Sequence, residues 1–183
     1  MRVITGSARG VRLLTPEGMK TRPTSDRVKE GLFSIIQFEV EGRRVLDLFA
    51  GTGQLGIEAL SRGAEHAVFV DFSQPAVKLV KENLRRTRLE EKAQVVQADY
   101  ESFLSGCRQS FDIIFLDPPY AEKFLENALK RISEIDILRD GGIIICEKTV
   151  EKDLQEDFPG LTCLKEYRYG NTSLVLFRKG TSA

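Results

Sequence analysis

The chain has 183 residues, of which 42% are hydrophobic and 30% charged, and its formal net charge is zero. This composition is typical of a soluble globular domain. No segment approaches the roughly 20 consecutive apolar residues that span a bilayer, and the opening "MRVITGSARG" lacks the apolar core of a signal peptide. We therefore expect a cytoplasmic protein with one main domain and room for a small appendage.

The first 20 residues are predicted to form a small hairpin extension. The strand-like runs "RVIT" and "VRLL" flank the turn-like "GSARG", and a helix follows within "RPTSDRVKEGLFSII". One face of that helix carries its apolar side chains, Val28, Leu32, Ile35 and Ile36. We expect residues 1–20 to be an appendage and residues 21–183 to be the main domain.

The N-terminal segment is also basic. Residues 1–30 contain seven Lys or Arg residues against three acids, so this part carries +4 and the rest of the chain −4. The basic residues are Arg2, Arg9, Arg12, Lys20, Arg22, Arg27 and Lys29. A basic segment on a mildly acidic protein indicates that an anionic partner binds at this end of the chain. On charge alone, an ordinary solvated surface remains open.

From residue 44 onward, strand-like and helical segments alternate. The predicted strands are Arg44–Phe49, Ala67–Asp71, Gln94–Ala98, Phe111–Leu116 and Gly142–Cys146. The predicted helices are Leu55–Arg62, Pro75–Arg88 and Phe124–Ile132, with Ser73 as N-cap of the second. This alternation predicts a doubly wound, Rossmann-like α/β fold with a parallel sheet and right-handed crossovers.

The C-terminal segment breaks this alternation. The runs "CLKEYRY" and "TSLVLFR" are strand-like and are separated by Gly170-Asn171, which is a hairpin signal. An antiparallel hairpin is therefore predicted to complete the sheet.

A glycine loop follows the first strand of the alternating region. In "VLDLFAGTGQLGIEAL", Gly51, Gly53 and Gly56 satisfy G-x-G-x-x-G, and Asp71 ends the next strand 20 residues after Gly51. This spacing matches the dinucleotide-binding fingerprint, in which the acid holds the ribose hydroxyls. NAD and S-adenosylmethionine both fit this pattern.

Two further acids favour S-adenosylmethionine. Asp47, four residues before Gly51, would repel a pyrophosphate and attract a sulfonium and an ammonium group. Asp99, in "VVQADY" after the third strand, can accept a hydrogen bond from the adenine amino group. An acid after a strand is also a common helix cap, and that interpretation of Asp99 stays open.

The fourth strand ends in "DPPY", residues 117–120. The side chain of Asp117 and the carbonyl of Pro118 offer two acceptors for the hydrogens of a base amino group, and the prolines hold that carbonyl in place. Tyr120 offers a flat face for stacking on a base. Catalysis by placement and electrostatics needs no strong general base here. The pattern predicts methyl transfer to an exocyclic amine.

The Cys and His residues exclude other chemistries. Cys107, Cys146 and Cys163 are widely spaced and His66 is the only histidine, so neither a zinc site nor a Ser-His-Asp triad is expected. Cys146 ends an apolar run and is predicted to be a small buried residue.

These motifs together resemble those of the RsmD family, which methylates N2 of a guanine in 16S ribosomal RNA. The resemblance covers nearly all of the chain. Its most specific parts are "RVITGSARGVRLLTP", "TRPTSDRVKEGLFSII", "DLFAGTGQLGIEALSRGA", "FDIIFLDPPY" and "YGNTSL". The "DPPY" signature is shared with DNA-adenine and protein-glutamine methyltransferases, so the N-terminal motifs carry the substrate assignment. Gln54 departs from the small residue that is common at its position.

The resemblance implies a seven-stranded class I methyltransferase fold, S-adenosylmethionine as cofactor, and 16S rRNA of the small ribosomal subunit as partner, with no metal and no membrane. The implied cofactor-binding residues are Asp47, Phe49, Gly51, Gly53, Asp71, Phe72, Asp99 and Tyr100. The implied catalytic residues are Asp117, Pro118, Pro119 and Tyr120, and the implied RNA-binding residues are Arg9, Arg12, Arg22, Thr24 and Arg27.

Three other functions remain open on the sequence. The first is the same chemistry on adenine or on a protein glutamine; Asp117 in place of Asn and the short chain argue against it. The second is a dinucleotide-binding oxidoreductase, which Asp47 disfavours. The third is an RNA-binding assembly factor with an inactive pocket, which the intact glycine loop disfavours.

Overall fold

The computed structural model describes residues 1–18, 23–119 and 122–181. Its centre is one seven-stranded sheet with the strand order β3-β2-β1-β4-β5-β7-β6. The strands are β1 (Arg44–Asp47), β2 (His66–Asp71), β3 (Ala93–Gln97), β4 (Phe111–Leu116), β5 (Leu138–Thr149), β6 (Leu161–Tyr169) and β7 (Thr172–Lys179). The first five strands are parallel, and β7 pairs antiparallel with both β5 and β6. The predicted α/β sheet and its terminal hairpin are confirmed.

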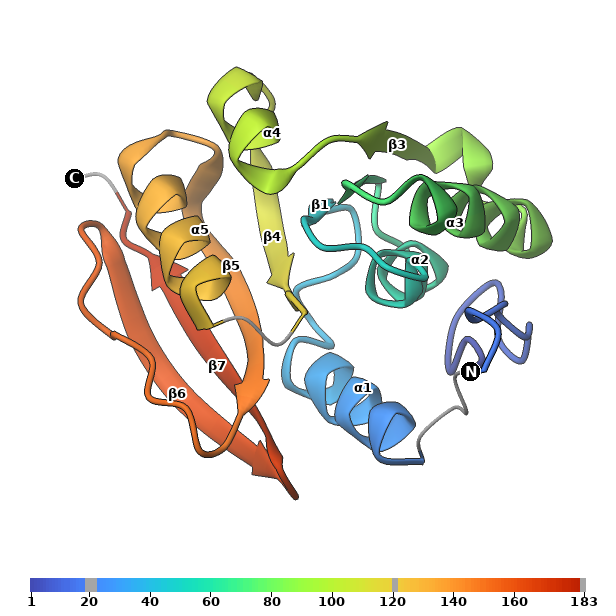
Figure 1. Ribbon diagram of the computed structural model, residues 1–183, viewed down its shortest axis with the longest axis horizontal. Coiled ribbons are helices and arrows are strands. Elements are labelled where there is room, and N and C mark those ends of the chain that lie inside the picture. Colours follow the sequence, from blue (N-terminus) through green and yellow to red (C-terminus); the bar gives the residue numbers. More distant parts are fainter. Residues whose placement is uncertain (19–22, 120–121, 182–183) are drawn as a thin grey trace.

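Helices cover both faces of the sheet (Figure 1). They are α1 (Pro23–Ile35), α2 (Gln54–Ser61), α3 (Gln74–Thr87), α4 (Tyr100–Gly106) and α5 (Glu122–Glu134). Apolar residues of α1, α2 and α3 share one buried cluster with the sheet, and those of α4 and α5 share the other. Among the helices of the described ranges, none is long and apolar enough to cross a membrane.

Most predicted elements are found within one or two residues of their expected ends. Ser73 caps α3 as predicted, because its hydroxyl accepts a hydrogen bond from Ala76 N at 3.4 Å, and Cys146 is fully buried. The two strand-like runs predicted in residues 1–18 form only an isolated bridge, and two later elements differ. Helix α4 was not predicted, and β5 begins four residues earlier than the apolar run, because a bulge with Gly141 at φ 73° precedes that run.

The N-terminal segment forms a hairpin-like turn with a single antiparallel bridge between Arg2 and Arg12. Val3, Ala8 and Leu13 are buried in the same apolar cluster as α1 and α2. The segment therefore contributes side chains to the core of the main domain, and a domain boundary at residue 20 stays a prediction.

Candidate active site

Four carboxyl groups lie at the carboxyl edge of four neighbouring strands. Asp71, Asp47, Asp117 and Glu147 belong to β2, β1, β4 and β5 or directly follow them, in that order across the sheet. In each case the residue two positions earlier belongs to the apolar cluster that α1, α2 and α3 share with the sheet. These residues are Phe69, Val45, Phe115 and Ile145. Because side chains of a strand alternate between faces, all four carboxyl groups belong to this one face.

Asp47 lies deeper than its neighbours. Its register partners are Phe69 in β2 and Phe115 in β4, so it sits two residues, roughly 6.6 Å, below the level of Asp71 and Asp117. Asp47 is 1% exposed, and its carboxyl accepts a hydrogen bond from Gly56 N at 3.1 Å. Asp47 therefore fixes the start of α2 below the glycine loop.

The glycine loop needs each of its three glycines. Gly51 and Gly53 have φ angles of 57° and 80°, in the left-handed region that favours glycine. A Cβ on Gly56 would lie 2.3 Å from the Phe69 ring, so this glycine permits close packing of α2 on β2. The loop brings backbone groups to the edge of the sheet, where a ligand can approach them closely.

Asp71 supports the same loop. One carboxylate oxygen accepts a hydrogen bond from Gly51 N at 2.9 Å, and the other accepts from Ser73 N at 2.9 Å. A carboxylate offers about four acceptor sites, so capacity remains for ribose hydroxyls. The adjacent Phe72 side chain is 71% exposed and provides an open apolar surface next to this acid.

Asp99 is a helix cap, as one of the two interpretations of the sequence expected. Its carboxylate accepts a hydrogen bond from Ser102 N at 3.0 Å at the start of α4. Hydrogen bonding to Ser102 lowers the pKa of Asp99. The carboxylate therefore stays ionised, and its remaining lone pairs keep an adenine contact open as a prediction.

An aromatic cluster borders the site on the α4 and α5 side. The ring of Tyr100 lies 5.3 Å from that of Phe49 and 5.7 Å from that of Phe124. The motifs predict Phe49 and Tyr100 at the cofactor, whereas the sequence predicts Phe124 only as the start of a helix. The sequence holds no short-range sign of this contact, because Phe124 lies 24 residues after Tyr100.

Burial of the carboxyl groups changes their protonation. Burial raises the pKa of Asp47 to about 8, and the carboxylates of Asp117 and Asp71 add to this shift while Gly56 N–H opposes it. Burial also raises the pKa of Asp117 to about 6. Burial and the Asp117 carboxylate raise the pKa of Glu147 to about 8. A cationic ligand would relieve this repulsion.

The structure describes three of the four residues of the predicted catalytic motif. Asp117 and Pro118 are half-buried and Pro119 is exposed, whereas Tyr120 lies outside the described residues. Glu147, next to Asp117, was not predicted. The sequence signal was an acid directly after "GGIIIC", at the carboxyl end of the strand beside β4.

The predicted RNA-binding residues are only partly described. Arg9, Arg12 and Arg27 are exposed, and within the described ranges none of the three forms an ion pair. Thr24 lies in the first turn of α1, and Arg22 lies outside the described residues. Lys29 is 2% exposed, so it cannot serve as a surface cation.

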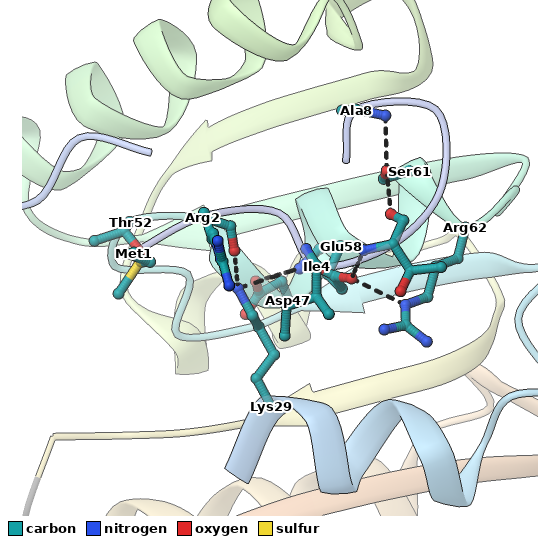
Figure 2. A network of polar contacts seen from close by, with 12 residues as sticks. Met1, Arg2, Ile4, Ala8, Lys29, Asp47, Thr52, Glu58, Ser61 and Arg62 are labelled. Carbon is teal, nitrogen blue, oxygen red and sulfur yellow. Dashed lines mark hydrogen bonds and ion pairs between the residues drawn. The ribbon is translucent and has the colours of Figure 1, made fainter. Parts of the chain in front are cut away.

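A buried glutamate joins the basic segment to α2 (Figure 2). The Glu58 carboxylate accepts hydrogen bonds from Ile4 N at 2.9 Å, Thr5 N at 3.0 Å and Arg62 Nε at 3.0 Å. Lys29 Nζ lies 3.8 Å from the same carboxylate and donates to the carbonyl of Arg2 at 2.7 Å. From the sequence, Glu58 is predicted only as part of a helix.

Asn83 makes a second attachment. Its side chain accepts from Leu14 N at 2.7 Å and donates to the carbonyls of Leu14 at 3.0 Å and Thr52 at 2.9 Å. Thr52 belongs to the glycine loop, and its hydroxyl donates to the sulfur of Met1 at 3.4 Å. The N-terminal segment therefore reaches the loop directly through Met1 and indirectly through Asn83.

The model of the family "Conserved hypothetical protein 95" matches residues 1–178. The chain belongs to this family. It is 43% identical over 182 residues to "Putative rRNA methyltransferase YlbH" of Bacillus subtilis, covering 98% of this chain and 99% of the relative. It is 35% identical over 183 residues to "Ribosomal RNA small subunit methyltransferase D" of Haemophilus influenzae, covering 97% and 93%.

A solved structure is similar over the whole chain. "Putative methyltransferase yhhF from Escherichia coli" superposes with a TM-score of 0.89 at 30% identity, covering 100% of this chain and 99% of that one. The family match and these relatives confirm the RsmD-like assignment made on the motifs. The class I methyltransferase fold is confirmed as well.

The residues present fit S-adenosylmethionine. Glycines 51 and 53 open the loop, Asp71 keeps acceptor capacity for ribose hydroxyls, and the raised pKa values of Asp47 and Asp117 mark a site that favours a cation. Gln54, the residue that departs from the family pattern, has a buried Oε1 that accepts no hydrogen bond from the described part of the chain. That oxygen is an acceptor at the first residue of α2, directly after the loop.

Proposed function

We propose that this protein transfers a methyl group from S-adenosylmethionine to the exocyclic N2 of a guanine in 16S rRNA. One observation carries the proposal. Asp117 ends the strand next to the glycine-loop strand and belongs to the same face of the sheet as Asp47 and Asp71. An amine held by Asp117 thus lies beside the place where the cofactor fits.

The residues of the chain position the amine. The carboxylate of Asp117 accepts one N–H of the amino group and the carbonyl of Pro118 accepts the other, which turns the nitrogen lone pair away from the ring. When bound, S-adenosylmethionine supplies an electrophilic methyl group on a sulfonium. Transfer would form the N–C bond and break the C–S bond, with S-adenosylhomocysteine as the leaving group, and Asp117 or water would take the amine proton. Placement and electrostatics supply the rate enhancement.

Asp47 and Asp117 support the choice of cofactor. A positive charge near these two carboxyl groups favours their ionised forms, and S-adenosylmethionine carries a sulfonium and an ammonium. A nicotinamide dinucleotide would instead bring a pyrophosphate to the same acidic loop. The acid positions therefore favour the sulfonium ligand.

The basic segment supports an RNA substrate. Arg9 and Arg12 are exposed cations in the segment that is anchored beside the glycine loop, and Arg27 is an exposed cation in α1. Two curated relatives are named for rRNA methylation. The main domain has no net positive charge to hold RNA, so we propose that an assembled or assembling small subunit completes the docking surface, in the cytoplasm.

Labelled methyl transfer tests the proposal. Protein-free rRNA, small ribosomal subunits and DNA are offered in parallel, and the modified base is mapped by mass spectrometry. We expect N2-methylguanine in small-subunit rRNA, and a loss of transfer in Asp117→Ala with S-adenosylhomocysteine binding retained. Methylation of an adenine, or full turnover by Asp117→Ala, would contradict the proposal.

A further inference from the structure

Glu147 has no role in the mechanism above, yet it is the neighbour of Asp117 across the sheet. Leu116 and Cys146 are register partners in parallel strands β4 and β5, so Asp117 and Glu147 form the next pair. Adjacent strands lie roughly 4.8 Å apart, and both side chains belong to the face that holds Asp47 and Asp71. Across the sheet, Glu147 follows Asp117 on the side away from the cofactor.

The Glu147 carboxyl has acceptor capacity that the protein does not use. Within the described ranges, no backbone or side-chain group donates a hydrogen bond to it. Its partner in β7 is the apolar Leu174. The next residue, Lys148, is a cation, but its Nζ forms an ion pair with Glu166 Oε1 at 3.1 Å. Half-buried acceptors are rarely left without a donor, so this carboxyl fits a ligand that supplies an N–H group.

A guanine supplies that group in the right place. Its N2 amine is flanked by the N1–H donor, whereas the N6 amine of adenine is flanked by a bare N1 acceptor. We propose that Glu147 accepts the N1–H of the target base while Asp117 accepts an N2–H, so that Glu147 selects guanine over adenine. This inference rests on the proposed function, because it assigns the base edge that the same site recognises.

The selection has a physical cause. Above the pKa of about 8 that burial and the Asp117 carboxylate give Glu147, its ionised carboxylate facing a bare ring nitrogen brings two acceptors together, and both lose their hydrogen bonds on leaving water. Sites built to hydrogen-bond a substrate group reject analogues without it by about 10⁴-fold. Asp117 alone gives no such discrimination, since both bases present an amino group to it.

Two RNAs that differ only at the mapped position test the inference. One carries guanine at the mapped position and the other 2-aminopurine, which keeps the amine on the same carbon but has a bare N1. At pH 8.5, where most of the Glu147 carboxyl is ionised, the wild type is expected to prefer guanine by about 10⁴-fold in kcat/KM. Glu147→Gln can turn its amide N–H₂ toward the bare N1, so we expect its preference to fall at least about 10-fold.

Glu166→Gln is the matched control, because Glu166 lies in β6 and pairs with Lys148. S-adenosylhomocysteine affinity and urea unfolding are measured for both variants, and we expect Glu147→Gln to keep cofactor affinity. An unchanged preference in Glu147→Gln, or a preference that falls equally in Glu166→Gln, would overturn the inference. So would a loss of cofactor affinity that accounts for the lost activity. If the wild type methylates no guanine, the proposed function fails first, and the inference falls with it.

Discussion

Glu58 and Lys29 form a buried ion pair, with 3.8 Å between Oε2 and Nζ and side chains that are 0% and 1% exposed. Neither charge is satisfied by the other alone. Arg62 Nε donates to Glu58, and the backbone of residues 2–5 supplies the other hydrogen bonds, from Ile4 N and Thr5 N to Glu58 and from Lys29 Nζ to the Arg2 carbonyl. The contact between α1 and α2 therefore depends on the N-terminal segment.

Glu58→Gln should destabilise the protein by about 3–5 kcal/mol, because it leaves Lys29 as a buried charge without its partner. Urea unfolding measures the loss. Hydrogen exchange should also lose protection at the amides of Ile4 and Thr5, which donate to Glu58.

Glu82→Gln serves as the control for this variant, since Glu82 pairs with Arg85 on the exposed side of α3. Its unfolding midpoint should remain close to that of the wild type. Full protection of Ile4 and Thr5 in Glu58→Gln would refute the anchoring role of Glu58.

Gly56→Ala should destabilise the protein by about 1–3 kcal/mol, because the new Cβ would lie 2.3 Å from the Phe69 ring in a packed core. Gly106→Ala is the matched control, since a Cβ there meets nothing within 4 Å. The two variants are compared by urea unfolding. Equal stabilities would mean that the third glycine of the loop is not required for packing.

Binding of S-adenosylmethionine at pH 7 should release protons. Burial raises the pKa of Asp47 to about 8, and a positive sulfonium nearby favours ionisation. Calorimetry in two buffers with different ionisation enthalpies gives the number of protons released. S-adenosylhomocysteine, which lacks the sulfonium charge, should release fewer. Equal proton release by both ligands would show that the sulfonium charge does not change the ionisation of Asp47.

The ligand-free protein should lose stability as pH rises from 5 to 9. The pKa of Glu147 is about 8 in the folded state against an ordinary 4.5, so its stabilising contribution is complete below about 4.5 and is lost as pH rises through 8. Glu147→Gln removes this group and lowers repulsion on Asp117, so its urea midpoint should fall less over the same range. Parallel pH profiles would show that Glu147 does not carry a raised pKa.

Replacement of Arg9 and Arg12 by Ala should weaken RNA binding and flatten its salt dependence by about 0.7–0.9 per lost phosphate contact. Arg43→Ala combined with Arg139→Ala is the control. Both of these arginines pair with Asp112, which lies near the amino end of β4, away from the carboxyl ends of the strands. Binding is measured by titration at several salt concentrations. The same slope in both double variants would exclude the N-terminal segment as the RNA contact.

The fold was largely predictable because its signals are local. Buried strands of Val, Ile and Phe alternate with capped helices, and Gly170-Asn171 marks the final turn, so element order alone specifies the sheet. The start of β5 was missed because the residues before Gly142 carry no apolar run and pair with β4 only across a bulge. Helix α4 was missed because it is only seven residues long.

The site was predictable where sequence motifs mark it. It was not predictable where it depends on contacts between residues far apart in the sequence. Asp47, Asp71 and Asp117 each follow a strand within a recognisable motif, and the structure brings them to one edge. Glu147 and Phe124 belong to no motif, and their neighbourhood follows only from strand order and helix packing. Glu58 lies within a motif, but its partners are 53 and 54 residues away, so its role has no local signal.

The attachment of Leu14 to Asn83 has a consequence for biosynthesis. The two residues are 69 positions apart, and synthesis runs from the N-terminus. The arginines at positions 9 and 12 therefore leave the ribosome well before the helix that holds their segment has been made. In the nascent chain, the segment that is proposed to bind ribosomal RNA stays undocked until α2 and α3 have emerged.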